Sequence, residues 1–202
     1  LNAQWLNNTS ASALNIAARE LTLNTSSVLN YDACIIATGG VARELPQQPR
    51  AQGIHQLRTL HDAQALREEL QPGKKLVVIG AGFIGLEAAA TAVARGCTVT
   101  VLEGLPAPLI RGLGEKMGIA ATAIHATQGV SIRCNVRVQG IETHAGSVTG
   151  VRISDGTSES VVEADVVLVG IGVAPATQWL DGSGLTVNDG VVCDAHLQAA
   201  PG

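Results

Sequence analysis

Three glycines that follow a short aliphatic run constrain this chain more than any other feature. The run covers residues 76–79, and Gly80, Gly82 and Gly85 follow it in the spacing GxGxxG. In this motif the first glycine permits a sharp turn out of a strand. The second lets a phosphate group approach the backbone, and the third lets the following helix pack closely on the sheet. The glycines therefore predict the strand, turn and helix of a Rossmann-type dinucleotide-binding unit.

The residues after the glycines complete the predicted unit. Residues 84–95 are rich in Ala and predict a helix, so Phe83 and Ile84 at its start are expected to border the phosphates of a ligand. Residues 98–103 predict the next strand, which ends in Glu103. A carboxylate about 20 residues after the glycines can accept hydrogen bonds from the adenosine ribose. The alternative for Glu103 is a solvated charge at a strand end.

Composition and the remaining pattern predict an α/β fold. Apolar residues make up 46% of the chain and aromatic residues only 2%, which favours an aliphatic core and a parallel sheet with helices on both faces. Thr59 is the expected N-cap of a helix over residues 60–70, and a further helix is expected over residues 115–127. Alternating runs between residues 134 and 162 predict an antiparallel β-meander, and residues 166–169 predict a last buried parallel strand.

The segment before the glycines is predicted to be rich in strands. Residues 17–23 and 26–29 predict a short hairpin. Residues 31–38 predict a buried strand that ends at Thr38 and Gly39. A single Rossmann unit does not account for this additional strand.

Two further features flank the predicted nucleotide site. Gly170, Ile171 and Gly172 end a buried strand at the carboxyl edge of the sheet, where they either leave room for a nicotinamide ring or only form a turn. Arg111, in the loop after Glu103, could reach an adenine or a phosphate, or remain a solvated cation. No other cation comes between them, so Glu103 should repel a 2′-phosphate and favour NADH over NADPH.

Several kinds of function are not supported by the sequence. The net charge is −4 without a basic stripe, so nucleic-acid binding is not expected. No apolar run reaches the roughly 18 residues of a membrane span. The dispersed cysteines and histidines predict no metal site, and reduced thiols suit a cytoplasmic protein. The cysteines are Cys34, Cys97, Cys134 and Cys193.

Several segments together resemble the FAD-dependent pyridine nucleotide-disulfide oxidoreductases. Residues 31–40, YDACIIATGG, resemble the YDxLIIATG segment of that family. Residues 57–63, followed by GAGFIGLE at residues 80–87, are similar to the ferredoxin reductase and rubredoxin reductase branch. Two later runs resemble the strand that returns the chain to the FAD domain and its continuation; these are residues 164–175 and 189–194.

The resemblance implies a domain organisation. Residues 47–173 would form a NAD-binding domain, flanked by parts of an FAD-binding domain in residues 1–46 and 174–202. The family carries a second GxGxxG upstream and a Gly-Asp pair downstream, both in its FAD site, and this chain contains neither. We therefore expect a piece of a flavoenzyme that holds no FAD and is inactive by itself.

The resemblance also implies a reaction and further site residues. In the full-length protein, hydride would pass from NADH to flavin, and electrons would pass to a ferredoxin- or rubredoxin-type acceptor. Glu87 matches a Glu that lies near the nicotinamide and the flavin in similar enzymes, although a carboxylate in the first turn of a helix also suits the helix dipole. Thr38 and Gly39 would approach the FAD. The alternatives are a non-catalytic NADH-sensing flavoprotein of apoptosis-inducing-factor type and a disulfide or nitrite reductase relative.

Overall fold

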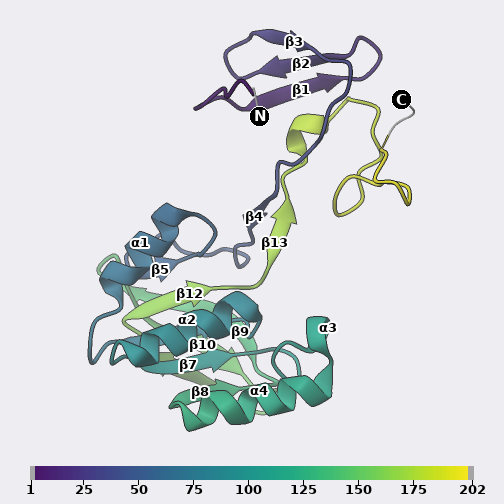
Figure 1. The fold of residues 1–202 in the computed structure, drawn as a ribbon. Coiled ribbons are helices and arrows are strands. Elements are labelled where there is room, and N and C mark those ends of the chain that lie inside the picture. Colours follow the sequence, from purple (N-terminus) through teal and green to yellow (C-terminus); the bar gives the residue numbers. More distant parts are fainter. Residues whose placement is uncertain (1–2, 200–202) are drawn as a thin grey trace. The chain divides into compact units, whose positions relative to one another are not determined.

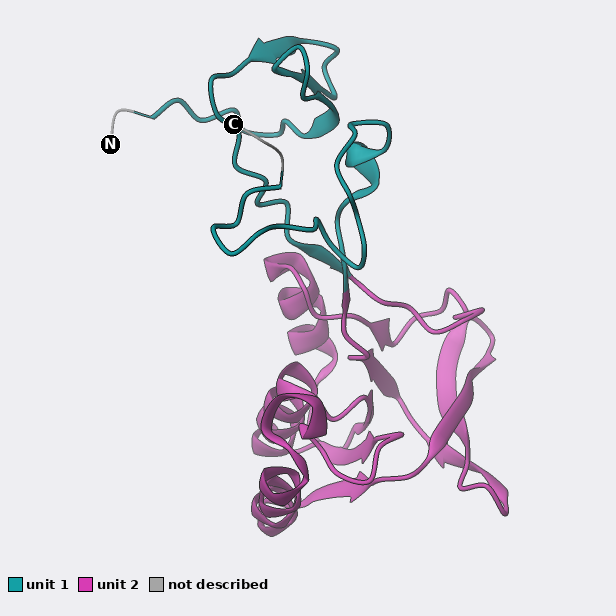
Figure 2. Cartoon of the chain, turned by 90° about the vertical axis from the view of Figure 1, so that its right-hand side faces the viewer, with its two compact units in different colours: residues 1–41, 174–202 teal, residues 42–173 magenta. Residues whose placement is uncertain are grey.

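A computed structural model describes residues 3–199 of the chain as two compact units. The larger unit, unit 2, is Ala42–Val173, and unit 1 combines Leu1–Val41 with Ala174–Gly202 (Figure 2). Unit 2 begins at Ala42, whereas the sequence suggested that this domain begins at residue 47.

Unit 2 is built around a five-stranded parallel sheet. Every neighbouring pair of strands is parallel, so each connection crosses over the sheet. Strands β6 (Lys75–Ile79) and β7 (Thr98–Leu102), which precede and follow the glycine motif and its helix, pair with each other. Strand β7 also lies beside β8 (Val130–Arg133) (Figure 1). The order across the sheet is β5 (Ile54–His55), β12 (Val166–Val169), β6 (Lys75–Ile79), β7 (Thr98–Leu102) and β8 (Val130–Arg133).

The helices of unit 2 begin and end close to the predicted positions. The Thr59 side chain accepts a hydrogen bond from the Asp62 N–H and the Asp62 carboxylate accepts one from the Thr59 N–H, which completes a capping box at the start of the first helix. The short α3 was not predicted. The helices are α1 (Leu60–Glu69), α2 (Phe83–Ala94), α3 (Ile110–Leu113) and α4 (Glu115–Thr127).

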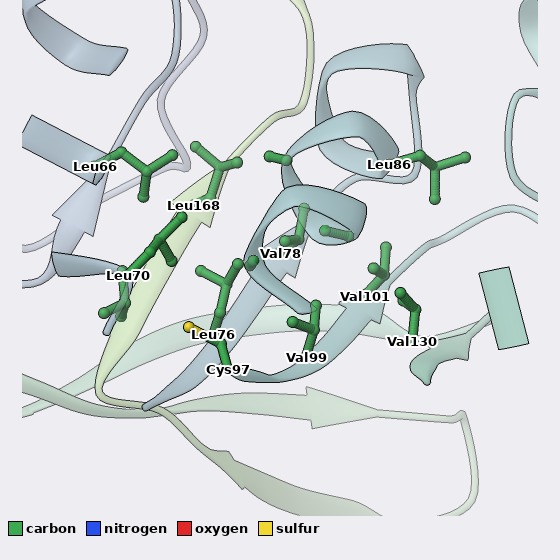
Figure 3. Close-up of a cluster of buried hydrophobic side chains, with 14 of the residues drawn as sticks. Leu66, Leu70, Leu76, Val78, Leu86, Cys97, Val99, Val101, Val130 and Leu168 are labelled. Atoms are coloured by element: carbon green, nitrogen blue, oxygen red, sulfur yellow. The ribbon is translucent and has the colours of Figure 1, made fainter. Parts of the chain in front are cut away.

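The two faces of the parallel sheet are covered differently. Alternate strand residues, Leu76 and Val78 among them, point into one cluster with side chains of α1 and α2 (Figure 3). The intervening strand residues, Val77 and Val167 among them, point into a second cluster with side chains of the antiparallel sheet. The expectation of helices on both faces was therefore wrong, because the apolar face of the meander covers one side (Figure 2). The meander, which was predicted, consists of β9 (Arg137–His144), β10 (Ser147–Ser154) and β11 (Glu159–Glu163).

Unit 1 contains short antiparallel strands. The expected hairpin is present, although its strands begin a few residues later than predicted, and an unpredicted third strand, β1, pairs with it. The strands are β1 (Ala11–Asn15), β2 (Glu20–Leu23) and β3 (Val28–Asn30). Beyond them β4 (Gly40–Ala42) pairs with β13 (Val173–Pro175), which the short helix η1 (Gln178–Leu180) follows.

Residues 31–38 contradict the prediction of a buried strand. They form no strand, and the Ile35 side chain is 91% exposed. A strand needs a neighbour to pair with its backbone groups along its length, and among the described residues this segment joins no sheet, although the Tyr31 N–H donates to the Arg19 carbonyl oxygen. Its apolar pattern is therefore not matched by burial.

The described part of the chain contains no helix that is long and apolar enough to cross a membrane. Within residues 3–199 no group of His, Cys, Asp or Glu side chains is arranged to hold a metal ion. All four cysteines are free thiols.

Candidate dinucleotide-binding site

A cavity of about 580 Å³ lies at the carboxyl ends of the parallel strands, entirely within unit 2. This edge is where open α/β sheets bind ligands. The cavity brings together most of the residues predicted from the sequence, from four separate segments of the chain. These are Gly80, Gly82, Phe83, Ile84, Glu103, Arg111, Gly170, Ile171 and Gly172.

The three glycines of the motif have different surroundings. At Gly80 the backbone has φ +99°, and a Cβ would lie 2.4 Å from the Gly170 carbonyl oxygen. A Cβ at Gly85 would lie 2.2 Å from the Gly80 carbonyl oxygen, so the turn and the helix approach too closely for a side chain. A Cβ at Gly82 would meet no atom within 4 Å. Gly80 and Gly85 therefore permit backbone packing, whereas Gly82 faces open space in which a ligand fits.

The beginning of α2 offers backbone donors to this open space. Gly82 is the N-cap of the helix, and no side chain caps it. The first N–H groups of a helix have no partner within the helix, and the helix dipole places partial positive charge there. A pyrophosphate group supplies the acceptors and the negative charge that such a terminus lacks.

Glu103 connects the strand end to the glycine turn. Its carboxylate accepts a hydrogen bond from the Ala81 N–H at 2.8 Å and another from the Leu105 N–H at 2.9 Å. One bond reaches each oxygen, so each oxygen keeps capacity for a further donor. The half-buried carboxylate can thus hold the turn in place and still accept a ribose hydroxyl.

Arg111 lies in the short helix α3, so its prediction as a loop residue was wrong. The Leu109 N–H donates to the Ala81 carbonyl oxygen at 3.0 Å, which ties the start of α3 to the glycine turn. Gly112 packs against the Phe83 ring, since a Cβ there would lie 3.3 Å from it. These contacts place Arg111 on the wall of the cavity.

Glu87 is outside the residues that line the cavity. Because α2 begins at Phe83, Glu87 lies beyond the first helical turn, which contains no acidic residue, and the first-turn placement was wrong. Its side chain is exposed, and its backbone carbonyl oxygen accepts a hydrogen bond from the Thr91 hydroxyl.

Thr38 and Gly39 lie in unit 1 and do not line the cavity. The Thr38 hydroxyl donates to the Ala176 carbonyl oxygen at 2.9 Å, and the Gly39 carbonyl oxygen accepts from the Ala176 N–H. The interactions of these two residues thus join the two chain segments that form unit 1.

One charged residue that lines the cavity was not predicted from the sequence. Arg137, at the start of β9, lines the same wall as Gly104 and Val136. It lies in an ordinary alternating strand pattern and far from Glu103 along the chain, so only the pairing of the segments reveals it. Nearby, burial and then the Glu103 carboxylate raise the pKa of the Cys134 thiol, which therefore stays neutral and adds no negative charge at neutral pH.

The parallel sheet, its helices and the cavity at its carboxyl edge define a Rossmann-type α/β unit with an antiparallel sheet on one face. The chain matches the family model of the pyridine nucleotide-disulphide oxidoreductases over residues 1–201, and it belongs to this family.

Several relatives of the chain are named as reductases of electron-transfer proteins. The chain is 37% identical over 205 residues to putidaredoxin reductase of Pseudomonas putida, covering 98% of this chain and 48% of that protein. It is 39% identical over 185 residues to the ferredoxin–NAD(+) reductase component of the biphenyl dioxygenase system of Paraburkholderia xenovorans, covering 91% and 44%. A solved covalent complex of putidaredoxin reductase with putidaredoxin superposes with a TM-score of 0.87 at 35% identity, covering 94% of this chain and 46% of that one. The chain thus spans about half the length of these relatives.

Proposed function

We propose that unit 2 binds NADH within an FAD-dependent NAD(P)H oxidoreductase. Hydride would pass from NADH to flavin, and electrons would pass on to a ferredoxin- or rubredoxin-type acceptor. The observation that carries this proposal is the joint presence, in one cavity, of the uncapped α2 terminus, the open face of Gly82 and the Glu103 carboxylate.

The groups that line the cavity support one orientation of the dinucleotide. The pyrophosphate would lie on Gly82 and the first N–H groups of α2, because charge and donors coincide there. The adenosine ribose would then reach Glu103 on one side. The nicotinamide would lie on the other side, against Gly170 and Gly172, which have no side chain to exclude a flat ring, and beside Ile171, which packs against the second core cluster.

The names of the relatives support the proposed acceptor. The two curated relatives described above are named as reductases of putidaredoxin and of a dioxygenase ferredoxin. These names favour electron transfer over NADH sensing without catalysis. When flavin is bound, it supplies the conversion from hydride to single electrons, and the residues of this chain bind and orient the nucleotide.

The role proposed for the residues outside the cavity is different. We infer that Glu87, exposed on α2, serves the flavin side of the reaction rather than nucleotide binding. Thr38 and Gly39, in unit 1, would also serve the flavin.

The chain contains one GxGxxG sequence, and that one lines the cavity of unit 2, so we expect the isolated chain to retain no FAD and to be inactive by itself. The exposed free thiols of Cys34 and Cys193 suit a reducing compartment such as the cytoplasm.

Calorimetric titration of the purified chain with NADH tests the central proposal. We expect saturable binding at one site, and competition by ADP-ribose, which carries the pyrophosphate and both riboses. A folded chain, verified by circular dichroism, that binds neither molecule would contradict the proposal. Absorbance at about 450 nm after denaturation measures any retained flavin, which we expect to be absent.

A further inference from the structure

Arg137 lies beside the proposed adenosine end of the cavity, although it is far from Glu103 in sequence. The Val136 N–H donates to the Glu103 carbonyl oxygen at 3.1 Å, and the Asn135 N–H donates to the Leu105 carbonyl oxygen at 3.1 Å. These two bonds hold the segment before β9 against the residues that follow β7. The next residue along the chain is Arg137, which therefore lies next to Glu103 and Gly104.

The space around Arg137 is open. Arg137 lines both the main cavity and a second cavity of about 400 Å³, and Gly104 and Val136 also line both. The Arg137 side chain is exposed, and no other described residue forms an ion pair or hydrogen bond with its guanidinium group. A Cβ at Gly104 would come no closer than 3.8 Å to any neighbour, the Val136 carbonyl oxygen. An added group on the adenosine ribose would thus have room beside Gly104.

The charges around this space favour an anion more than the sequence suggested. Glu103 is the acidic residue of the main cavity, and both of its carboxylate oxygens already accept backbone N–H groups. Asp155 lines the second cavity, but its carboxylate accepts hydrogen bonds from Thr157 and Ser158 within its own turn. Arg137 remains as a guanidinium with unused donors, which match the geometry of a phosphate group.

We propose that Arg137 is a specificity-determining residue that binds the 2′-phosphate of NADPH and so limits the preference for NADH that Glu103 imposes. This inference rests on the proposed nucleotide site. Glu103 repels the 2′-phosphate, whereas Arg137 attracts it from the adjoining wall. The chain should therefore bind NADPH measurably, although less tightly than NADH, and the affinity for NADPH should depend on Arg137.

The test compares Arg137→Gln with Arg133→Gln. Arg133 is an exposed arginine on β8 that lines neither cavity, and its contact with Glu103 is through its backbone carbonyl oxygen, so replacing its side chain makes the same change in net charge and keeps that hydrogen bond. Calorimetric titration of the whole chain with NADH and NADPH gives both dissociation constants for each protein. Arg137→Gln should weaken NADPH binding about tenfold, because charge-assisted hydrogen bonds to phosphate are lost. NADH binding should stay within about twofold, and Arg133→Gln should leave both constants within the same limit.

Short ligands isolate the adenosine end. Titration with 2′,5′-ADP and with ADP should show that Arg137→Gln weakens only the ligand with the 2′-phosphate. Equal weakening of NADH and NADPH binding, unchanged NADPH binding, or the same loss in Arg133→Gln would each overturn the inference, whereas NADH binding by the wild-type chain would still support the proposed function. Failure of the wild-type chain to bind NADH would instead contradict the proposed function. Circular dichroism confirms that the variants are folded.

Discussion

The two units of this chain bury their apolar residues to different extents. In unit 2 both faces of the parallel sheet are covered, and the residues of β6 and β12 are at most 3% exposed, apart from Lys75, the first residue of β6. In unit 1 few apolar side chains are buried, among them Leu14, Leu23 and Leu180. Several large ones are exposed there, including Trp5 and Ile35. The same kind of aliphatic run is thus core in one unit and surface in the other.

This difference shows where stability and binding reside. Burial of apolar area is the main favourable contribution to folding, and unit 2 contains both clusters that provide it. Unit 2 also contains the whole candidate site. We therefore expect paired substitutions in the two units to have very different effects.

The largest difference should come from removing a large aliphatic side chain. Leu168→Ala in β12 removes a side chain with 0% exposure and should lower the free energy of unfolding by about 2–5 kcal/mol. Ile35→Ala in unit 1 removes a side chain that is 91% exposed and should change it by less than about 0.5 kcal/mol. Urea unfolding followed by circular dichroism measures both. Similar losses would show that unit 1 is packed more tightly than its exposed residues indicate.

Glycine substitutions should separate packing from ligand access within unit 2. Gly85→Ala forces a methyl group against the Gly80 carbonyl oxygen and should destabilise the fold by about 1–3 kcal/mol. Gly82→Ala meets no neighbouring atom, so the melting temperature should be nearly unchanged while NADH binds several-fold more weakly. Thermal unfolding and NADH titration distinguish the two effects. If Gly82→Ala bound NADH normally, the proposed pyrophosphate position would be wrong.

Replacing one hydrogen-bonding side chain in each unit should affect nucleotide binding only in unit 2. Glu103→Gln removes the charged acceptor and should weaken NADH binding roughly tenfold, about 1.4 kcal/mol, while narrowing the difference between NADH and NADPH. Thr38→Val in unit 1 leaves the cavity unaltered and should leave the dissociation constant unchanged. Calorimetry provides the measurement, and tighter NADPH than NADH binding by the wild type would contradict the role of Glu103.

The smallest effect concerns the cap of α1. The backbone N–H of Thr59, more than any other contact, lowers the pKa of the Asp62 carboxyl in the folded chain. The ionised Asp62 carboxylate therefore contributes to the free energy of unfolding above the pKa of unfolded Asp, about 4. This contribution is lost as the pH falls through the lower pKa of the folded chain. Asp62→Asn should therefore cost about 0.5–1 kcal/mol at pH 7 and little at the lowest pH at which the chain stays folded.

Urea unfolding at several pH values follows this effect. The exposed Asp32→Asn in unit 1 serves as the control and should change stability little at any pH. A cost for Asp62→Asn that did not decrease at low pH would show that the charge of Asp62 is not what stabilises the cap.

Local signals predicted unit 2 well. Thr59 was predicted as an N-cap, and the bounds of α4 agree with the predicted helix, because caps and helical periodicity depend on neighbouring residues. Signals that need a distant partner were less informative. β5 contains only Ile54 and His55 and gave no strand signal, yet it pairs with β12 at the edge of the parallel sheet. Residues 31–38 gave a strong strand signal and form no strand.

Local sequence is sufficient to specify the glycine turn, the helix that follows it and the acid at the end of the next strand. The positive φ of Gly80, the close approach of Gly85 to the Gly80 carbonyl oxygen and the hydrogen bonds of one continuous segment impose this arrangement. Packing between distant segments determined that the meander covers one face of the sheet. It also decided that Arg137 lies beside Glu103, because backbone hydrogen bonds join segments that are far apart in the chain. Such pairings depend on how the whole sheet assembles, and no local sequence pattern at Arg137 predicts them.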